Sequence, residues 1–355
     1  MRIIYGICSW GLGHATRSLP VLRKFIKEDN EVTVISHGRS LELLQRELGP
    51  EHTYVDIPDY PILLSTSPRQ FMAKSMIYWP LFVRKLQQGH HQLKRLLLKK
   101  TYDLILSDAR YDIYSLSIPS FFISHQMRIM NPLRLRMLER GSEVFNSYFL
   151  DRFTGFIVPD YKEDDLSGEL SHHLTRINED KLHYVGVLSD FNKQHIKKDI
   201  DYLISITGPE PQRSMLEHNL LSQVDQLKGT IAVTLGKTEE RRESTKGNIR
   251  IFSYLSKEER ETLLNRAKLV ISRSGYSTIL DLAVIGTKAL MTPTPGQIEQ
   301  EYLAHYHHKK HTFYAVHQDH LDLPRDVEKA QQTTGITRNC DVEKSVEAIM
   351  ALVTS

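Results

Sequence analysis

Short runs rich in β-branched and aromatic residues alternate along this chain with amphipathic segments of helical period. This alternation is typical of parallel sheets whose strands are joined by helices. A first series of β-rich runs covers residues 3–8, 31–36, 102–106, 119–124 and 153–158. A second series begins near residue 202. The pattern predicts an α/β protein with two doubly wound, Rossmann-like domains in tandem.

The length of the chain also supports two domains. At 355 residues it exceeds the size at which one hydrophobic core usually stops growing. We predict an N-terminal domain over residues 1–188 and a second domain over residues 199–338, joined by a polar, lysine-rich linker. Residues 339–355 have an amphipathic pattern, which we interpret as a helix able to pack back on the N-terminal domain.

Composition narrows the class of protein. A formal net charge of +3 is too small to indicate a nucleic-acid partner. The two cysteines, Cys8 and Cys340, lack the spacing of a disulfide framework or a zinc site, which favours a reducing compartment. No stretch has the length and apolarity of a membrane span, and no signal-peptide pattern opens the chain. We expect a cytoplasmic protein, peripheral at the inner membrane face at most.

The segment GICSWGLGHATRSLP, at positions 6–20, joins the first β-rich run to a helical pattern. It fails as a dinucleotide fingerprint because Thr16 stands where the third glycine belongs, and it lacks the Gly-Lys-Ser/Thr end of a P-loop. His14 lies in the first turn of the expected helix, where the helix dipole disfavours a charged imidazole and suits a neutral general base. The alternative is a histidine that only caps or packs under the loop.

Residues 270–306, VISRSGYSTILDLAVIGTKALMTPTPGQIEQEYLAHY, carry more specific chemistry. Hydroxyl and backbone N–H groups at the start of the helix can hold a diphosphate. They belong to Ser274, Gly275, Ser277 and Thr278. Asp281, one turn further, can accept both hydroxyls of a ribose. Arg273 either screens a leaving diphosphate or forms a salt bridge with an acid.

This segment resembles the nucleotide-sugar half of GT-B glycosyltransferases, and of family 28 in particular, which includes the N-acetylglucosaminyltransferase of lipid II synthesis. The run Gly11-Leu12-Gly13-His14-x-x-Arg17 resembles the N-terminal glycine loop of the same family. The resemblance implies two domains that face each other across a cleft. The first would bind the acceptor and the second a nucleotide-sugar, UDP-linked in the family.

The resemblance also implies roles for further residues of the second domain. The loop after its first strand takes the place of a phosphate loop, residues 254–255 contact the base, and the loop PTPGQIEQ faces the sugar. The implied donor-binding residues are Gly208, Gln212, Arg213, Tyr254, Leu255, Arg273, Ser274, Gly275, Ser277, Thr278, Asp281, Gln297, Glu299 and Gln300. Relatives carry a glutamine and an asparagine where this chain has Glu301 and Ala304, so the donor sugar is left open.

For the N-terminal domain the analogy gives a mechanism. His14 is the candidate base that deprotonates the acceptor hydroxyl for one inverting displacement, and Asp108, at a strand end, orients it or binds the acceptor. The candidate acceptor-binding residues are Gly11, Gly13, Arg17, His125 and Gln126. The side chains of residues 108, 125 and 126 also fit simple helix caps. Helix dipoles and basic side chains offset the charge of the leaving diphosphate, so we expect neither a metal nor a cofactor.

The resulting hypothesis is a glycosyltransferase that moves a sugar from a nucleotide-sugar to a glycan, lipid-linked or small-molecule acceptor, in cell-envelope polysaccharide or glycolipid synthesis. Two alternatives keep the same donor site: a nucleotide-sugar 2-epimerase or hydrolase, and a non-catalytic nucleotide-sugar-binding protein. His307 and His311 have helical metal-ligand spacing, but no carboxylate motif accompanies them, so we expect a solvated basic helix end.

Residues 75–100 mix aromatic residues with many lysines and arginines. The pattern allows two interpretations: a basic face with aromatic anchors that contacts anionic lipid, or a domain helix with a buried apolar face and a solvated basic face. We favour the domain helix and keep peripheral membrane contact as the alternative.

Overall fold

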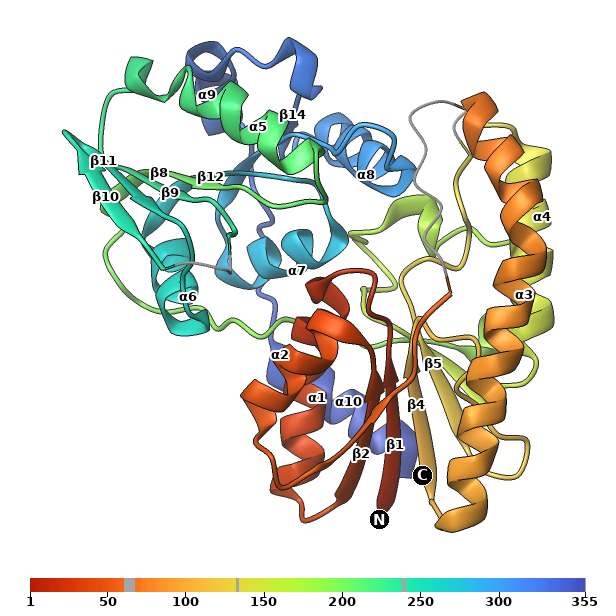
Figure 1. The fold of residues 1–355 in the computed structure, drawn as a ribbon. Helices are drawn as coiled ribbons and strands as arrows, with labels where there is room; N and C mark the ends of the chain where they lie inside the picture. The colour runs from red at the N-terminus through yellow and green to blue at the C-terminus, as the bar shows by residue number, and fades with distance from the viewer. Residues whose placement is uncertain (61–67, 132–133, 238–240, 355) are drawn as a thin grey trace. The chain divides into compact units, whose positions relative to one another are not determined.

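Figure 1 shows the computed structural model, which describes residues 1–60, 68–131, 134–237 and 241–354. The chain divides into two compact units. Unit 1 comprises Met1–Asp190 and Asp341–Ser355, and unit 2 comprises Phe191–Cys340. The first boundary falls within the expected linker, and the second lies at residues 340–341 instead of 338–339.

Unit 1 is built on a parallel sheet of seven strands in the order β3-β2-β1-β4-β5-β6-β7. The strands are β1 (Arg2–Ile7), β2 (Glu31–Ser36), β3 (Thr53–Asp56), β4 (Leu104–Asp108), β5 (Ser120–Ile123), β6 (Gly155–Val158) and β7 (Leu182–Tyr184). The helices are α1 (Leu12–Lys27), α2 (Gly38–Leu48), α3 (Pro68–Lys99), α4 (Arg136–Leu150) and α10 (Val342–Thr354). The strand order reverses between β1 and β4, which is the kind of position where ligands bind in such sheets.

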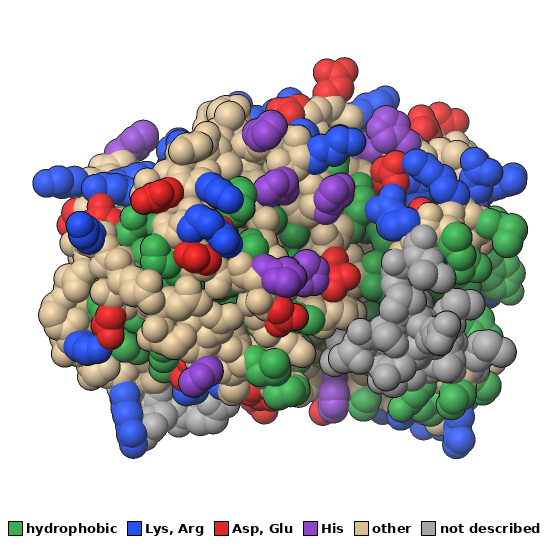
Figure 2. Space-filling model, turned by 90° about the horizontal axis from the view of Figure 1, so that it is seen from above, with side chains coloured by type: hydrophobic (Ala, Val, Ile, Leu, Met, Phe, Trp, Pro, Cys, Tyr) green, Lys and Arg blue, Asp and Glu red, His purple; other side chains and the backbone are tan. Residues whose placement is uncertain are grey.

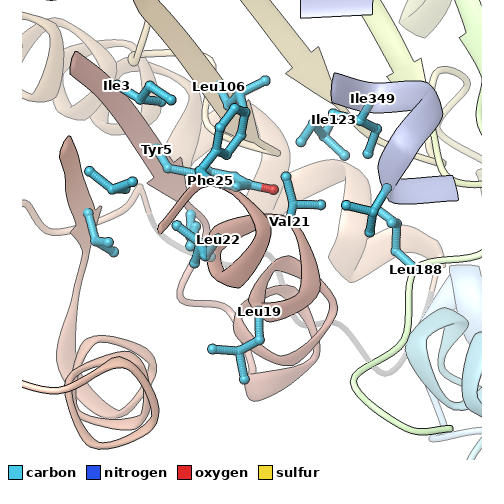
Figure 3. Packing of buried hydrophobic residues seen from close by; sticks show 14 of the residues in the cluster. Ile3, Tyr5, Leu19, Val21, Leu22, Phe25, Leu106, Ile123, Leu188 and Ile349 are labelled. Carbon is cyan, nitrogen blue, oxygen red and sulfur yellow. The ribbon is translucent and has the colours of Figure 1, made fainter. Parts of the chain in front are cut away.

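The main core of unit 1 lies between its sheet and the helices α1 and α10 (Figure 3). Ile3 and Tyr5 of β1 point to the same side of the sheet because they are two residues apart. Leu22 and Phe25 of α1 share one face because they are three residues apart. All four side chains are completely buried in one hydrophobic cluster.

Helix α10 packs on unit 1 although it follows unit 2 in the chain. Its side chains Val346, Ile349 and Met350 are buried in the same cluster as β1 and α1, and Figure 3 shows Ile349 near Ile123 of β5. The contact between α10 and α1 is therefore part of the unit 1 core.

Unit 2 is built on a second sheet of seven strands, in the order β10-β11-β9-β8-β12-β13-β14. The strands are β8 (Ile200–Ser205), β9 (Ile231–Thr234), β10 (Glu243–Lys246), β11 (Ile249–Phe252), β12 (Ala267–Ser272), β13 (Lys288–Met291) and β14 (Tyr314–Ala315). The helices are α5 (Gln212–Leu221), α6 (Lys257–Arg266), α7 (Tyr276–Ile285), α8 (Ile298–Lys309) and α9 (Leu323–Gln331). Neighbouring strands are parallel except in the β10–β11 hairpin.

Local signals in the sequence set helix boundaries in unit 2. Ser256 and Glu259 exchange side-chain to backbone hydrogen bonds in a capping box, which opens α6 as the sequence indicates. Gly286 ends α7 with a φ of 71°, a left-handed conformation that glycine adopts without steric cost. Because β8, β12, β13 and β14 pair in parallel, their carboxyl ends meet at one edge of the sheet, each followed by a loop.

None of the helices within the described ranges is both long enough and apolar enough to cross a membrane.

Candidate active site

The first candidate group lies at the carboxyl edge of the unit 1 sheet, where β1 and β4 are neighbours. β1 leads through a short loop to α1, whose first turn carries His14, and β4 ends at Asp108. His14 Nδ1 lies 2.8 Å from Asp108 Oδ1. A carboxylate in this position accepts a hydrogen bond from Nδ1–H, fixes the orientation of the ring and leaves Nε2 to take a proton from a substrate.

Asp108 is completely buried and receives hydrogen bonds from α1 as well. Arg17 donates from Nε to Asp108 Oδ2 at 2.8 Å and from a terminal nitrogen to Oδ1, and Ser18 donates to Oδ2 at 3.1 Å. Burial alone would raise the pKa of Asp108, but the charges of Arg17 and His14 and their hydrogen bonds hold it well below its ordinary value. Asp108 is therefore a permanent carboxylate, which suits an orienting group and not a proton carrier.

The position of Arg17 corrects the role predicted for it. Its side chain is 3% exposed, and its guanidinium is bound to Asp108 and lies 3.2 Å from Nδ1 of His125. Arg17 and the buried His125 thus belong to the layer that supports His14, whose own side chain is 22% exposed. The guanidinium of Arg17 is not presented to an acceptor.

The other predicted acceptor-side residues lie at the same ends of β1 and β5. Gly11 precedes α1, and nothing lies within 4 Å of the position that a β-carbon would take there. Gly13 lies in the first turn of α1, which carries no acidic side chain. No side chain caps this turn, so the first backbone N–H groups of the helix do not donate to a capping side chain. Gln126 follows β5, and its backbone N–H donates to the Ser124 hydroxyl.

The second candidate group lies at the carboxyl edge of the unit 2 sheet. Arg273 directly follows β12 and is 1% exposed. Its terminal nitrogens donate to the backbone carbonyls of Thr292, Pro293 and Gln212 and to the side-chain oxygen of Gln318, at 2.8–3.2 Å. The salt bridge predicted as one alternative for Arg273 is absent from the described part of the chain. Arg273 instead joins the loops that follow β8, β13 and β14.

Three buried polar atoms of this group have no hydrogen-bond partner within the described residues: Arg273 Nε, Thr292 Oγ1 and Thr294 Oγ1. Arg273 Nε and Thr294 Oγ1 lie 3.8 and 3.7 Å from the position that a β-carbon would occupy on Gly208, whose φ is +121°. We call this space the Gly208 notch. Because a buried N–H or hydroxyl without a partner costs free energy, the notch suits a polar ligand such as a phosphate oxygen.

The start of α7 offers further donors for an anion. Gly275 is the N-cap residue, and Ser277 and Thr278 lie half-buried in a first turn that has no acidic side chain. Asp281 is half-buried one turn further along α7, and Glu299 lies in the first turn of α8. The hydroxyl and N–H groups predicted to bind a phosphate therefore lie at the start of α7, and the predicted carboxylate lies one turn further along the same helix.

The loop between β13 and α8 is braced by its own side chains. Gln300 accepts the backbone N–H of Thr294 at 2.9 Å and donates from its amide to Gln297. Its carbonyl accepts the Ser274 hydroxyl at 2.8 Å, and Glu301 accepts a backbone N–H of the same loop at 2.9 Å. Gln300, predicted to contact the sugar, and Glu301, which departs from the family pattern, both serve to order the loop.

Arg213 also departs from its predicted role as a phosphate ligand. Its guanidinium pairs with Glu210 and with Glu217, the latter at 2.6 Å, so its charge is compensated by neighbours on α5 and the preceding loop. Tyr254 and Leu255 follow β11 as expected for residues near a base, and Leu255 is buried.

One cluster of possible metal ligands occurs among the described residues: Asp160, Asp165 and His172, after β6. Asp160 accepts two backbone N–H groups of the following loop at 2.9 Å, so this cluster braces that loop. His307 is 1% exposed and packs near Phe313, so the expectation of a solvated histidine at this position is wrong.

Two α/β units built on mostly parallel sheets, with polar groups at their carboxyl edges, have the architecture of the GT-B class, and the comparisons with known proteins agree. Residues 210–340 match the model of the glycosyltransferase family 28 C-terminal domain. Residues 1–55 match the model of glycosyl transferase family 1. The protein is a glycosyltransferase of the GT-B fold, and its C-terminal domain resembles that of family 28.

Similar proteins extend the likeness over the whole chain. An uncharacterized glycosyltransferase of Methanosarcina mazei is 24% identical over 324 residues, which cover 85% of this chain and 82% of the relative. The calicheamicin glycosyltransferase CalG4 has a TM-score of 0.65 at 12% identity, covering 99% of this chain and 94% of that one. The spinosyn rhamnosyltransferase SpnG, complexed with thymidine diphosphate, has a TM-score of 0.56 at 13% identity, covering 100% and 92%.

Proposed function

We propose that this glycosyltransferase transfers a sugar from a nucleotide-sugar bound by unit 2 to an acceptor hydroxyl activated in unit 1. The observation that carries the proposal is the Gly208 notch, where Arg273 Nε and Thr294 Oγ1 are buried without partners. An anionic oxygen of a diphosphate supplies the acceptor that both groups lack. The N-terminus of α7 favours the same negative charge.

The chemistry of the proposed transfer uses the candidate group of unit 1 as the base and that of unit 2 as the site of the leaving diphosphate. His14 Nε2 takes the proton of the acceptor hydroxyl while Asp108 holds the ring. The acceptor oxygen bonds to the anomeric carbon, the bond from that carbon to the diphosphate oxygen breaks, and its electron pair leaves with the nucleoside diphosphate. One displacement inverts the anomeric centre. Arg273 and the α7 N-terminus stabilise the leaving charge, so the step needs no metal ion.

UDP is the first candidate for the donor nucleotide, because the resemblance to family 28 implies it. The thymidine diphosphate of SpnG makes a dTDP-sugar the second candidate. A thermal-shift screen against UDP-, dTDP- and GDP-sugars separates them, since a ligand that binds only the folded protein raises its melting temperature. The proposal fails if no nucleotide-sugar stabilises the protein.

Product analysis with the donor that binds best separates transfer from the alternatives. Glycoside formation, undiminished by EDTA, supports the proposal. Release of free sugar or an epimer indicates the hydrolase or 2-epimerase, and binding without consumption indicates a non-catalytic protein. His14→Ala should abolish transfer and keep the thermal shift, whereas His218→Ala, at an exposed position on α5, should change neither.

We also propose that unit 1 contacts a membrane surface through α3. α3 carries seven lysines and arginines and neither aspartate nor glutamate along its 32 residues. Ile77, Leu81 and Leu98 are 74%, 39% and 87% exposed. Such a helix suits an anionic lipid surface, where a lipid-linked acceptor of glycolipid or envelope polysaccharide synthesis would be found. Cys8 and Cys340 are both free thiols, which fits work in the cytoplasm.

A further inference from the structure

The surroundings of Arg273 differ from those of other arginines in unit 2. Arg266 pairs with Asp199 and Arg325 with Asp326, as charged side chains ordinarily do. Both of these arginines lie at the surface, whereas Arg273 is 1% exposed and has the greater need of a counter-charge. Every partner of the Arg273 guanidinium is nevertheless neutral: three backbone carbonyls and one amide oxygen.

The missing counter-charge has an electrostatic consequence. Burial lowers the pKa of Arg273 to about 10, and no carboxylate in the described ranges acts to raise it again. The five N–H groups of the guanidinium lie on three nitrogens, and only Nε lacks a partner. The charge is therefore held in place by neutral groups on two nitrogens and directed at the Gly208 notch by the third.

Gln318 is the one side chain among these partners. It is 2% exposed, directly after the loop that follows β14, and its Oε1 accepts from Arg273 at 2.8 Å. Its own backbone carbonyl accepts from the side chain of Asn219 at 2.9 Å, which fixes the loop to α5. A glutamate of the same length at this position would make an ion pair with Arg273 on the side away from Nε.

We infer that Gln318 is a positioning residue for the donor diphosphate. It holds the Arg273 guanidinium with Nε toward the Gly208 notch, and because it is uncharged it leaves the positive charge for an anionic oxygen of the ligand. This inference rests on the proposed function, since it assigns the notch to the diphosphate of a nucleotide-sugar.

The decisive variant is Gln318→Glu, which keeps the length of the side chain and its hydrogen bond to Arg273, adds a negative charge, and gives up only the 3.5 Å contact of the Gln318 amide nitrogen with Gln212 Oε1. It should bind inorganic pyrophosphate and the nucleoside diphosphate chosen by the donor screen at least tenfold more weakly than the wild type. Binding of the corresponding nucleoside, which has no phosphate, should be unchanged. The KM for the donor should rise while the KM for the acceptor stays the same, and the melting temperature without ligand should not fall.

Two comparisons make the result specific. Gln332→Glu adds the same charge at an exposed position after α9 and should bind all three ligands like the wild type. Gln318→Met removes the hydrogen bond without adding charge, so diphosphate binding should weaken less than in Gln318→Glu. These results support the inference.

Three results would overturn it. One is unchanged pyrophosphate and diphosphate binding in a folded Gln318→Glu protein. Another is an equal loss of nucleoside and nucleotide binding, which indicates general disruption of the site. The third is a wild-type protein that binds nucleoside diphosphates but shows no difference between Gln318→Glu and Gln318→Met. If the wild type binds no nucleotide at all, the proposed function fails together with the inference, so the two failures are distinguishable.

Discussion

At the scale of single residues, the carboxylate of Asp108 binds two side chains of α1 at once. His14 occupies one oxygen at 2.8 Å, and Arg17 bridges both. Arg17 therefore compensates the buried charge of Asp108 by itself. In the proposed mechanism, in which His14 takes a proton from the acceptor, the same carboxylate stabilises the new charge.

Asp108→Asn tests this arrangement. The amide keeps the size of the side chain but loses the charge that orients His14 and compensates Arg17. We expect kcat to fall by about 10²–10⁴-fold, the range of a general base. We also expect the free energy of unfolding to fall by about 3–5 kcal/mol, because Arg17 loses its buried partner. Asp56→Asn is the control, since Asp56 also contacts a histidine but is 60% exposed.

The lowered pKa of Asp108 also predicts how the free energy of unfolding depends on pH. The pKa of Asp108 is lowered in the folded protein, so its stabilising effect is present above the unfolded pKa of about 4 and is lost as the pH falls toward the folded value. Acid unfolding of the wild type should steepen below about pH 4, and Asp108→Asn should be flatter there. Parallel unfolding curves for the two proteins would contradict the assignment.

The sequence could locate His14 and Asp108 at strand ends, because that requires only the residues and the β-rich runs. Their contact depends on the pairing of β1 with β4, which are about 100 residues apart, and no local pattern reveals it. The role of Gln318 could not be predicted from the sequence for a similar reason. It follows a strand of two residues, too short to give a hydrophobic pattern, and belongs to no motif.

At the scale of elements, α3 presents one exposed stripe. Ile77, Leu81, Arg84, Arg95 and Leu98 follow one another at intervals that return to the same helix face. Between the apolar ends of the stripe, side chains of Arg84, Arg95, a histidine and three glutamines line a shallow groove. Figure 2, seen from above, shows Lys and Arg beside hydrophobic side chains at the right, over the upper ends of α3 and α4 in Figure 1.

Charge reversal on this stripe tests membrane contact. Arg84→Glu/Arg95→Glu should lose most of its binding to vesicles that contain anionic phospholipid, since each basic residue near such a surface contributes about 1 kcal/mol. Lys228→Glu/Lys309→Glu, which changes the same charge at exposed sites of unit 2, should bind like the wild type. Co-sedimentation measures both. Equal vesicle binding by the two double variants would exclude this stripe as the membrane-contacting surface.

The bounds of the helices and strands show which of them a sequence pattern can predict and which it cannot. β2 matches its predicted run, residues 31–36, because a run of β-branched residues bounded by polar ones defines it. β10 has four exposed residues and no apolar pattern; only pairing with β11 makes it a strand. Pro20 lies inside α1, where proline ordinarily kinks or ends a helix, yet the helix is continuous from Leu12 to Lys27. Packing of Leu19, Val21 and Leu22 in the core outweighs the lost hydrogen bond.

At the scale of the whole molecule, the chain passes from unit 1 to unit 2 and returns. Unit 2 is one continuous segment, so residues 191–340 expressed alone should fold and bind the donor nucleotide. Residues 1–190 alone lack Val346, Ile349 and Met350, whose burial is worth about 1.5–3 kcal/mol each and together matches much of a typical net stability. This fragment should be unstable by circular dichroism, and adding the 341–355 peptide should stabilise it.

Both fragments folding equally well without the peptide would contradict this division of the core.

The two-unit architecture itself was predictable, because the alternation of strands and helices appears twice along the chain. The membership of α10 in unit 1 was only an expectation, since an amphipathic pattern shows that a helix has an apolar face and not which sheet receives it.

The return of α10 sets an order of events during synthesis. Residues 1–190 are synthesised first and residues 341–355 only after the whole of unit 2, so the half that carries His14 lacks part of its core until the last of these segments has left the ribosome. The unit that is synthesised first is therefore the one that completes its core last. A chain truncated near residue 340 would keep the whole segment of unit 2 and lack the closing helix of unit 1.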